Sequence, residues 1–234
     1  MNSNLNIAGL TPMSTVDYPN HLAAVLFTQG CPLRCGYCHN PHLIPSCNKS
    51  DQIEWCSVIE FLKKRVGFLQ AVVFSGGEPT MQSVLPEAIK QVKDMGYKIG
   101  IHTSGIYPGK IEKILSDIDW IGLDVKALPE NYERVTGRKG ISANVDKTLK
   151  MINRSSIEHE IRITVHSLDV DVIGIQMLID RMTSVGVKNC VIQLARMGDN
   201  LNEDYRFYEN KIVYADLKNI VNHNREKFKS LTYR

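Results

Sequence analysis

Residues 30–40, which follow the first apolar run of the chain, read Gly30-Cys31-Pro32-Leu33-Arg34-Cys35-Gly36-Tyr37-Cys38-His39-Asn40. The three cysteines stand at spacings of four and three residues, and the glycines and the proline favour a loop that wraps around a compact object. Iron–sulfur clusters are held by cysteine thiolates, usually one per iron. Three ligands on a four-iron cluster would leave one iron open for chemistry. The motif therefore favours a cluster on Cys31, Cys35 and Cys38, with a structural zinc site or free buried cysteines as alternatives.

Outward from this loop, short runs of strand-forming residues alternate with stretches of helical periodicity. The predicted strands are residues 22–28, 71–75, 98–103, 120–125, 160–165 and 190–194. The predicted helices are residues 51–65, 84–94, 110–115, 145–153, 172–183 and 214–228. This alternation predicts βαβ units and a mostly parallel sheet. Six units could form an open doubly wound sheet or an incomplete barrel, and both place ligands beyond the carboxyl ends of the strands.

Polar and glycine-rich segments stand where the predicted strands end. Ser75-Gly76-Gly77-Glu78-Pro79 follows the second strand, and His102-Thr103-Ser104-Gly105 closes the third. The fourth strand ends in Asp124-Val125-Lys126. Because the carboxyl ends of parallel strands share one edge of a sheet, we expect a binding site there.

Strand alternation sorts the charged residues by face. Asp124 and Lys126 share a face with Gly122, opposite an apolar face. Buried charges are costly unless paired, so we expect these two to hold a polar ligand or each other, unless they form a solvated strand end. Arg162 shares a face of the fifth strand with Thr164 and His166.

Composition limits the classes of protein to consider. The chain has 234 residues, 43% hydrophobic and 23% charged, with a net charge of +3, which suits one globular domain and gives no argument for nucleic acid. Residues 1–10 lack a signal-peptide pattern, and the longest apolar run, 22–27, is too short to span a membrane. We therefore expect a cytoplasmic protein, in whose reducing surroundings six cysteines indicate metal or redox chemistry.

The cysteine motif also carries a family resemblance. Cys-x3-Cys-x2-Cys with an aromatic residue before the last cysteine resembles the signature of the radical S-adenosylmethionine (SAM) superfamily. Val16-Asp17-Tyr18-Pro19, residues 27–31 and residues 38–41 resemble the activating enzymes of glycyl radical enzymes. The Asp-Tyr-Pro stretch is most similar to activators of anaerobic ribonucleoside-triphosphate reductase, although this chain has Asn20 where that pattern often has glycine.

The resemblance implies a fold, cofactors and partners. The fold would be a partial (β/α)6 barrel in a single domain, 1–234, with an N-terminal extension (1–20), six βα units (21–200) and a C-terminal helical segment (201–234). The cofactors would be one [4Fe-4S] cluster and SAM, with no other catalytic group. The partners would be a glycyl radical enzyme and an electron donor such as flavodoxin or ferredoxin, with no nucleic acid and no membrane. A pyruvate formate-lyase type activator, a radical SAM enzyme acting on a small molecule and a non-enzymatic iron–sulfur protein are the alternatives.

The resemblance also implies site residues. Gly76, Gly77 and Glu78 would line the amino group of SAM, and Arg162 would meet its carboxylate. The remaining implied SAM contacts are Asp124 and Lys126, Tyr37 beside the adenine, Thr103 and Ser104 near the ribose, and Gln193 and Arg196 at the adenine. His166 could belong to the site or to the surface, whereas we interpret Cys47, Cys56 and Cys190 as structural, because cysteine packs as a small hydrophobe.

Overall fold

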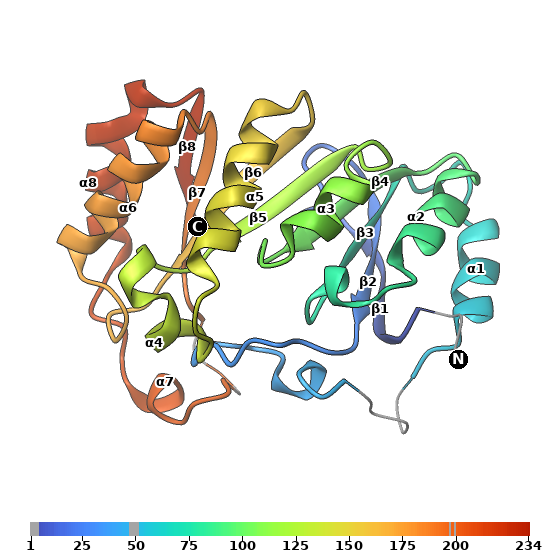
Figure 1. The fold of residues 1–234 in the computed structure, drawn as a ribbon, viewed down its shortest axis with the longest axis horizontal. Coiled ribbons are helices and arrows are strands. Elements are labelled where there is room, and N and C mark those ends of the chain that lie inside the picture. The colour runs from blue at the N-terminus through green and yellow to red at the C-terminus, as the bar shows by residue number, and fades with distance from the viewer. Residues whose placement is uncertain (1–4, 47–51, 197, 199) are drawn as a thin grey trace. The chain divides into compact units, whose positions relative to one another are not determined.

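All six predicted strands form in the computed structural model, which describes residues 5–46, 52–196, 198 and 200–234. They are β2 (Ala23–Thr28), β3 (Ala71–Gly76), β4 (Lys98–Thr103), β5 (Trp120–Val125), β6 (Glu158–Val165) and β7 (Asn189–Leu194). Two further strands, β1 (Ile7–Ser14) and β8 (Ser230–Tyr233), extend the sheet to the order β1 to β8 (Figure 1). β1 runs antiparallel to β2, whereas β2–β3, β3–β4, β6–β7 and β7–β8 are parallel pairs. The predicted α/β fold with a mostly parallel sheet is confirmed.

The two added strands lie outside the six predicted strands. β1 falls within the N-terminal extension, residues 1–20, with Gly9 and Pro12 inside it. Both residues weaken a strand prediction, and proline is tolerated on edge strands. Residues 201–234 contain helices as expected but finish in β8, whose four residues are too few to give a recognisable alternation.

Helices connect the strands. They are α1 (Trp55–Lys63), α2 (Leu85–Lys93), α3 (Pro108–Ile114), α4 (Tyr132–Thr136), α5 (Ser142–Arg154), α6 (Val172–Val185), α7 (Asp204–Phe207) and α8 (Tyr214–Asn224). Short 3-10 turns cover Pro41–Leu43, Pro79–Met81, Pro129–Asn131 and Arg225–Lys227. Sequence periodicity missed only the short α4 and α7 among the α-helices described. In the described part of the chain, no helix combines the length and the apolar character that a membrane crossing needs.

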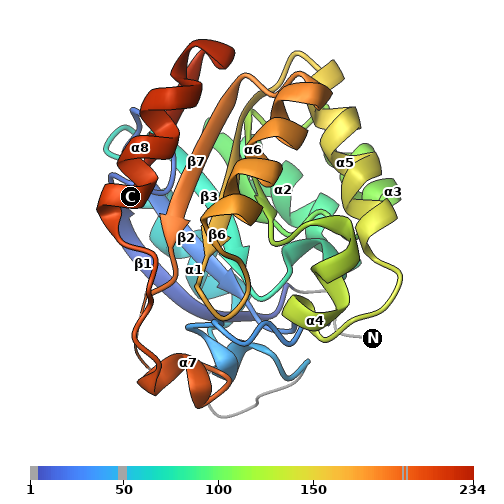
Figure 2. The ribbon, with the colours of Figure 1, turned by 90° about the vertical axis from the view of Figure 1, so that its left-hand side faces the viewer.

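The described chain forms two compact units that divide β5 between them. The first unit comprises Met1–Pro32, His42–Thr103 and Tyr107–Gly122, and the second comprises Leu33–Pro41, Ser104–Ile106 and Leu123–Arg234. In the second unit, α8 contacts both β8 and α6. Figure 2 shows this unit with α6, α8 and β7 labelled. The cysteine motif is also divided between the two units. Cys31 belongs to the first unit, and Cys35 and Cys38 belong to the second.

Tyr18, from the Asp-Tyr-Pro stretch, lies in the core of the first unit. Its side chain is buried, and its ring centroid lies 5.5 Å from that of Trp120. A Cβ added at Gly100 would lie 2.9 Å from the ring, so β4 has glycine where Tyr18 crosses it. Asn20, which replaces the glycine of the related pattern, has a positive φ of 62°. Asparagine tolerates this left-handed conformation better than most residues, so the departure from the pattern keeps the turn.

Replacing Tyr18 with alanine should destabilise the protein by about 3–5 kcal/mol, because a large aromatic side chain leaves a cavity in the core. The free energy of unfolding is measured by urea denaturation, followed by the fluorescence of Trp120 and the second tryptophan. The matched control is Val16→Ala, two residues away and 76% exposed, which should change stability by no more than about 0.5 kcal/mol. Equal effects of the two substitutions would contradict the packing of Tyr18.

Candidate cofactor-binding site

In the first unit, the Gly76-Gly77-Glu78 turn lies against the end of β2 with no room for side chains. A Cβ at Gly76, whose φ is +105°, would lie 2.3 Å from the backbone nitrogen of Thr28. A Cβ at Gly77 would lie 2.2 Å from the carbonyl oxygen of Gly30, which accepts a hydrogen bond of 2.9 Å from the backbone N–H of Glu78. The two glycines are therefore required by backbone contact with the segment that leads into Cys31.

Glu78 is a buried carboxylate in this unit. Its Oε1 accepts hydrogen bonds from the backbone N–H of Thr80 at 3.1 Å, from the Thr80 hydroxyl at 2.5 Å and from the Thr103 hydroxyl at 2.8 Å. Three donors on one oxygen compensate for the loss of water around it. The structure thus brings together Glu78 and Thr103, two of the predicted site residues.

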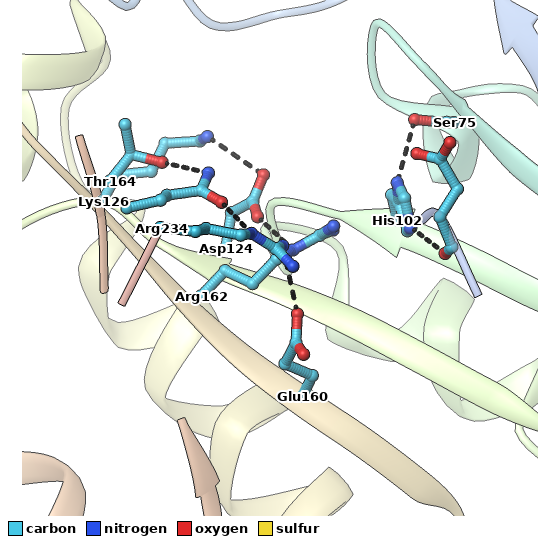
Figure 3. A network of polar contacts seen from close by, with 10 residues as sticks. Ser75, His102, Asp124, Lys126, Glu160, Arg162, Thr164 and Arg234 are labelled. Carbon is cyan, nitrogen blue, oxygen red and sulfur yellow. Dashed lines mark hydrogen bonds and ion pairs between the residues drawn. The ribbon is translucent and has the colours of Figure 1, made fainter. Parts of the chain in front are cut away.

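His102 connects the Asp-Tyr-Pro stretch to the start of the same turn (Figure 3). Its Nε2 lies 2.9 Å from the carbonyl oxygen of Asp17, and its Nδ1 lies 3.2 Å from the Ser75 hydroxyl. Because a carbonyl oxygen only accepts, Nε2 carries the proton and Nδ1 accepts from Ser75. Sequence reasoning placed His102 at a strand end but did not assign it this contact.

In the second unit, Asp124 holds two cations (Figure 3). Its Oδ1 accepts from Nε of Arg162 at 3.0 Å, and its Oδ2 lies 3.5 Å from Nζ of Lys126. The side chains of Arg162 and Lys126 are only 10% and 13% exposed. Asp124 and Lys126 pair with each other, which is one of the outcomes that their shared face left open. Two cations on one carboxylate leave the group with a net positive charge, which favours an anionic ligand.

Gln193 continues this polar group along the neighbouring strand. Its Nε2 donates to the Thr164 hydroxyl at 2.7 Å, and its Oε1 accepts from Nε of Arg234 at 3.4 Å. Arg234 also lies 3.3 Å from Glu160 Oε1. Sequence reasoning missed Arg234 because β8, which precedes it, was not predicted.

In the cysteine loop of the second unit, Cys35 and Tyr37 are buried, whereas Cys38 is half-buried. Burial raises the pKa of the Cys35 thiol to about 11, although the nearby Lys126 ammonium opposes this. Burial also raises the pKa of Tyr37, whose ring centroid lies 5.8 Å from Lys126 Nζ. The Tyr37 hydroxyl is buried and has no hydrogen-bond partner among the described residues. An orphaned buried hydroxyl is costly, so this site fits a ligand that supplies a polar group.

The metal site itself stays a prediction. Within the described ranges, no three His, Cys, Asp or Glu side chains form a group that could hold a metal ion. Three thiolates in a glycine-containing loop nevertheless match the donor set of an iron–sulfur cluster. Cys47 lies outside the described residues.

The remaining predicted residues differ in their burial. Ser104 is buried in the second unit, whereas Arg196 is exposed, and its backbone N–H donates to Nε2 of His39 at 3.2 Å. His166 is fully buried, and burial lowers its pKa, so a surface role is wrong. Its ring lies 4.7 Å from that of Tyr205, a residue that sequence reasoning missed because its segment has no periodicity.

The two other described cysteines differ from each other. Cys190 is buried at the start of β7, as expected, and burial raises its pKa to about 12. Cys56 lies in a helix, as expected, but it is exposed, so the prediction that it packs as a small hydrophobe is wrong. α1 buries the stripe Trp55, Val58, Ile59 and Leu62, and residue 56 lies off it.

Comparison with known proteins gives a family and a fold. The family model described as the Radical SAM superfamily matches residues 25–171. A protein of Methanocaldococcus jannaschii named as a glycyl-radical enzyme activating enzyme is 34% identical over 152 residues, 63% of this chain and 61% of that protein. The pyruvate formate-lyase-activating enzyme of Clostridium pasteurianum is 34% identical over 165 residues, 67% of this chain and 66% of that protein. The chain thus spans under two thirds of the length of each relative.

A solved structure shows the fold. Streptococcus suis SuiB bound to S-adenosylmethionine superposes with a TM-score of 0.66 at 16% identity, over 88% of this chain and 48% of that chain. Together with the open, mostly parallel sheet, this likeness confirms the predicted partial (β/α)6 barrel.

Thiol labelling should distinguish the two described cysteines outside the motif, Cys56 and Cys190. Iodoacetamide should modify Cys56 readily in the native protein and leave Cys190 unmodified until the protein is unfolded, because only an accessible thiolate reacts. Peptide mass spectrometry measures the modified fraction at each site, with Cys56→Ser as the control for assignment. Equal labelling of both thiols in the native state would contradict the burial of Cys190.

Proposed function

The chain belongs to the radical SAM superfamily, and on that premise we propose that it activates a glycyl radical enzyme. The family uses a [4Fe-4S] cluster and SAM. When bound, the cluster and SAM would supply the one-electron chemistry that removes a hydrogen atom from a glycine of the partner. The protein's own residues hold the cofactors and keep water from them.

The observation that carries the proposal is the similarity of the sequence to two relatives that are named as activating enzymes. One is named for glycyl radical enzymes in general and the other for pyruvate formate-lyase. The Asp17-Tyr18-Pro19 stretch favours anaerobic ribonucleoside-triphosphate reductase as the partner. The electron would come from a small donor protein such as flavodoxin or ferredoxin.

We assign the cluster to Cys31, Cys35 and Cys38. The first cysteine follows Gly30, whose carbonyl oxygen accepts the Glu78 N–H. The loop would supply three thiolate ligands to the four-iron cluster, and SAM would bind at the remaining iron.

The residues proposed to contact the amino acid part of SAM differ in charge. Lys126 and Arg162, both held by Asp124, would attract the carboxylate of SAM, and the planar guanidinium suits that shape. Glu78, which follows Gly76 and Gly77, would accept a hydrogen bond from the ammonium group of SAM.

The nucleoside part of SAM would meet less strongly charged groups. Tyr37 would lie beside the adenine, where its buried hydroxyl would gain the polar partner that the described residues lack. Thr103 and Ser104 would contact the ribose, and Arg196 the adenine.

Asp124→Ala and Lys126→Ala should each weaken SAM binding while leaving iron loading unchanged. Each loses a charge-assisted contact worth about 1.5–3 kcal/mol, or about ten- to a hundredfold in the dissociation constant. SAM binding is measured by anaerobic titration calorimetry of the reconstituted protein. Asp117→Ala is the matched control, since Asp117 pairs with Lys93 on the surface and should have no effect. Unchanged affinity in both site variants would refute the assignment.

The proposed function is tested by transfer of the radical. Reconstituted protein, dithionite and SAM are mixed anaerobically with anaerobic ribonucleotide reductase or with pyruvate formate-lyase from the same cell. The correct partner should develop the doublet EPR signal of a glycyl radical, with about one deoxyadenosine formed per radical, because the right substrate completes the reactive arrangement. If neither partner gains the signal and a small metabolite consumes SAM over many turnovers, the activator proposal is wrong.

A further inference from the structure

A segment beyond the family match contacts the cysteine loop in the second unit. The family model ends at residue 171, yet the backbone N–H of Asn202 donates to the carbonyl oxygen of Gly36 at 3.1 Å. The backbone N–H of Leu201 donates to the carbonyl oxygen of Cys38, also at 3.1 Å. Two main-chain hydrogen bonds thus hold the part of the loop that carries Cys38.

Tyr205, from α7 in the same segment, lies directly on the loop. A Cβ added at Gly36 would lie 2.3 Å from Cε2 and 2.8 Å from Cζ of the Tyr205 ring, far below any ordinary contact distance. The ring of Tyr37 meets that of Tyr205 edge-on at a centroid distance of 6.3 Å. Position 36 therefore requires glycine as long as the Tyr205 ring keeps its place.

Polar and ring contacts with residues outside the cysteine loop hold the Tyr205 ring in place. Its hydroxyl donates to Oδ1 of Asp169 at 2.7 Å, and Arg134 Nη1 donates to the same oxygen at 3.2 Å. The ring of His166 lies 4.7 Å away, and the backbone N–H of Asp169 donates to the His166 carbonyl oxygen at 2.8 Å. The Asp169 side chain is only 6% exposed. A ring held in this way cannot move aside at low cost.

We propose that Tyr205 is a positioning residue that fixes the cysteine loop at Gly36, and with it Cys35 and Cys38, in the conformation that receives the cluster. This inference rests on the proposed assignment of the cysteines. Ligands held by their neighbours lose less conformational entropy when the metal group binds, and residues that support a ligand affect metal affinity strongly.

Cluster assembly and retention test the proposal. Gly36→Ala should lower iron loading or cluster stability by about tenfold, because the new methyl group would clash with the Tyr205 ring. Tenfold is the lower end of the loss in metal affinity on substitution of residues that support metal ligands. The double variant Gly36→Ala/Tyr205→Ala should recover a substantial part of that loss, because removing the ring makes room for the new methyl group. Tyr205→Phe keeps the ring and removes only the hydrogen bond to Asp169, so it should retain loading but lose the cluster faster in air. The control is Phe207→Ala, on the same helix and 81% exposed, which should behave as the wild type.

Three measurements are made on each anaerobically reconstituted variant. They are iron and sulfide per chain, the half-life of the cluster absorbance in air, and the EPR spectrum of the reduced cluster with and without SAM. The spectrum reports the geometry around the cluster, which a loss of general stability would not change. Thermal unfolding of the apo forms confirms that each variant folds.

The outcomes separate the inference from the function on which it rests. If the wild type binds no four-iron cluster, or if Cys35→Ala still loads fully, the proposed ligand assignment fails. The single variant Tyr205→Ala, which lacks the ring on the loop, should lose the cluster faster than the wild type. If the wild type loads and Tyr205→Ala matches it in half-life and EPR spectrum, the positioning role alone is wrong. The positioning role is also wrong if the double variant Gly36→Ala/Tyr205→Ala recovers none of the loading or cluster stability lost in Gly36→Ala.

Discussion

The close approach of two backbones, at Gly30 and Gly77, is the constraint on which the first unit depends. The carbonyl oxygen of Gly30 occupies the space that a side chain at residue 77 would fill. Because of this contact, the end of β3 turns directly under the segment that leads to Cys31, and Glu78 is brought next to Thr103. A methyl group at either Gly76 or Gly77 would separate the strand ends and move the buried carboxylate from its donors. The chemistry proposed for this turn thus follows from a steric condition on the backbone.

Electrostatics plays the corresponding role in the second unit. Asp124 is shared between Arg162 on the next strand and Lys126 two residues on, and all three side chains are largely shielded from water. A lone buried cation would be costly, and a single ion pair would be neutral and would attract neither sign strongly. Two cations that share one carboxylate avoid both outcomes, since each cation has a partner and the three side chains together carry a net positive charge. This arrangement suits a ligand whose carboxylate must be bound and oriented.

Residue periodicity predicted the six central strands and the face that Asp124 and Lys126 share, because both follow from local alternation. It could not predict β1, in which Gly9 and Pro12 oppose strand formation, and tertiary pairing with β2 decides the outcome. Cys56 was misjudged although the signal was present, since the apolar stripe of α1 excludes that position. Alternation assigned His166 to a face of the predicted fifth strand, but it could not predict the contact of its ring with Tyr205, far away in sequence. Contacts of this kind have no local signal.

The cysteine loop lies within the part of the chain that matches the family, but the contacts that fix its conformation come from a segment beyond that match. The match to the family ends at residue 171, whereas the hydrogen bonds and the ring that hold Gly36 and Cys38 come from residues 201–205. A loop with three ligands within eight residues has many conformations of similar energy, and only a fraction of them bring the thiols together. Contacts from a distant segment reduce that number without touching the thiols. The spacing of Cys31, Cys35 and Cys38 therefore specifies which atoms can bind a cluster. The contacts of α7 and its neighbours determine what fraction of the loop conformations can bind it.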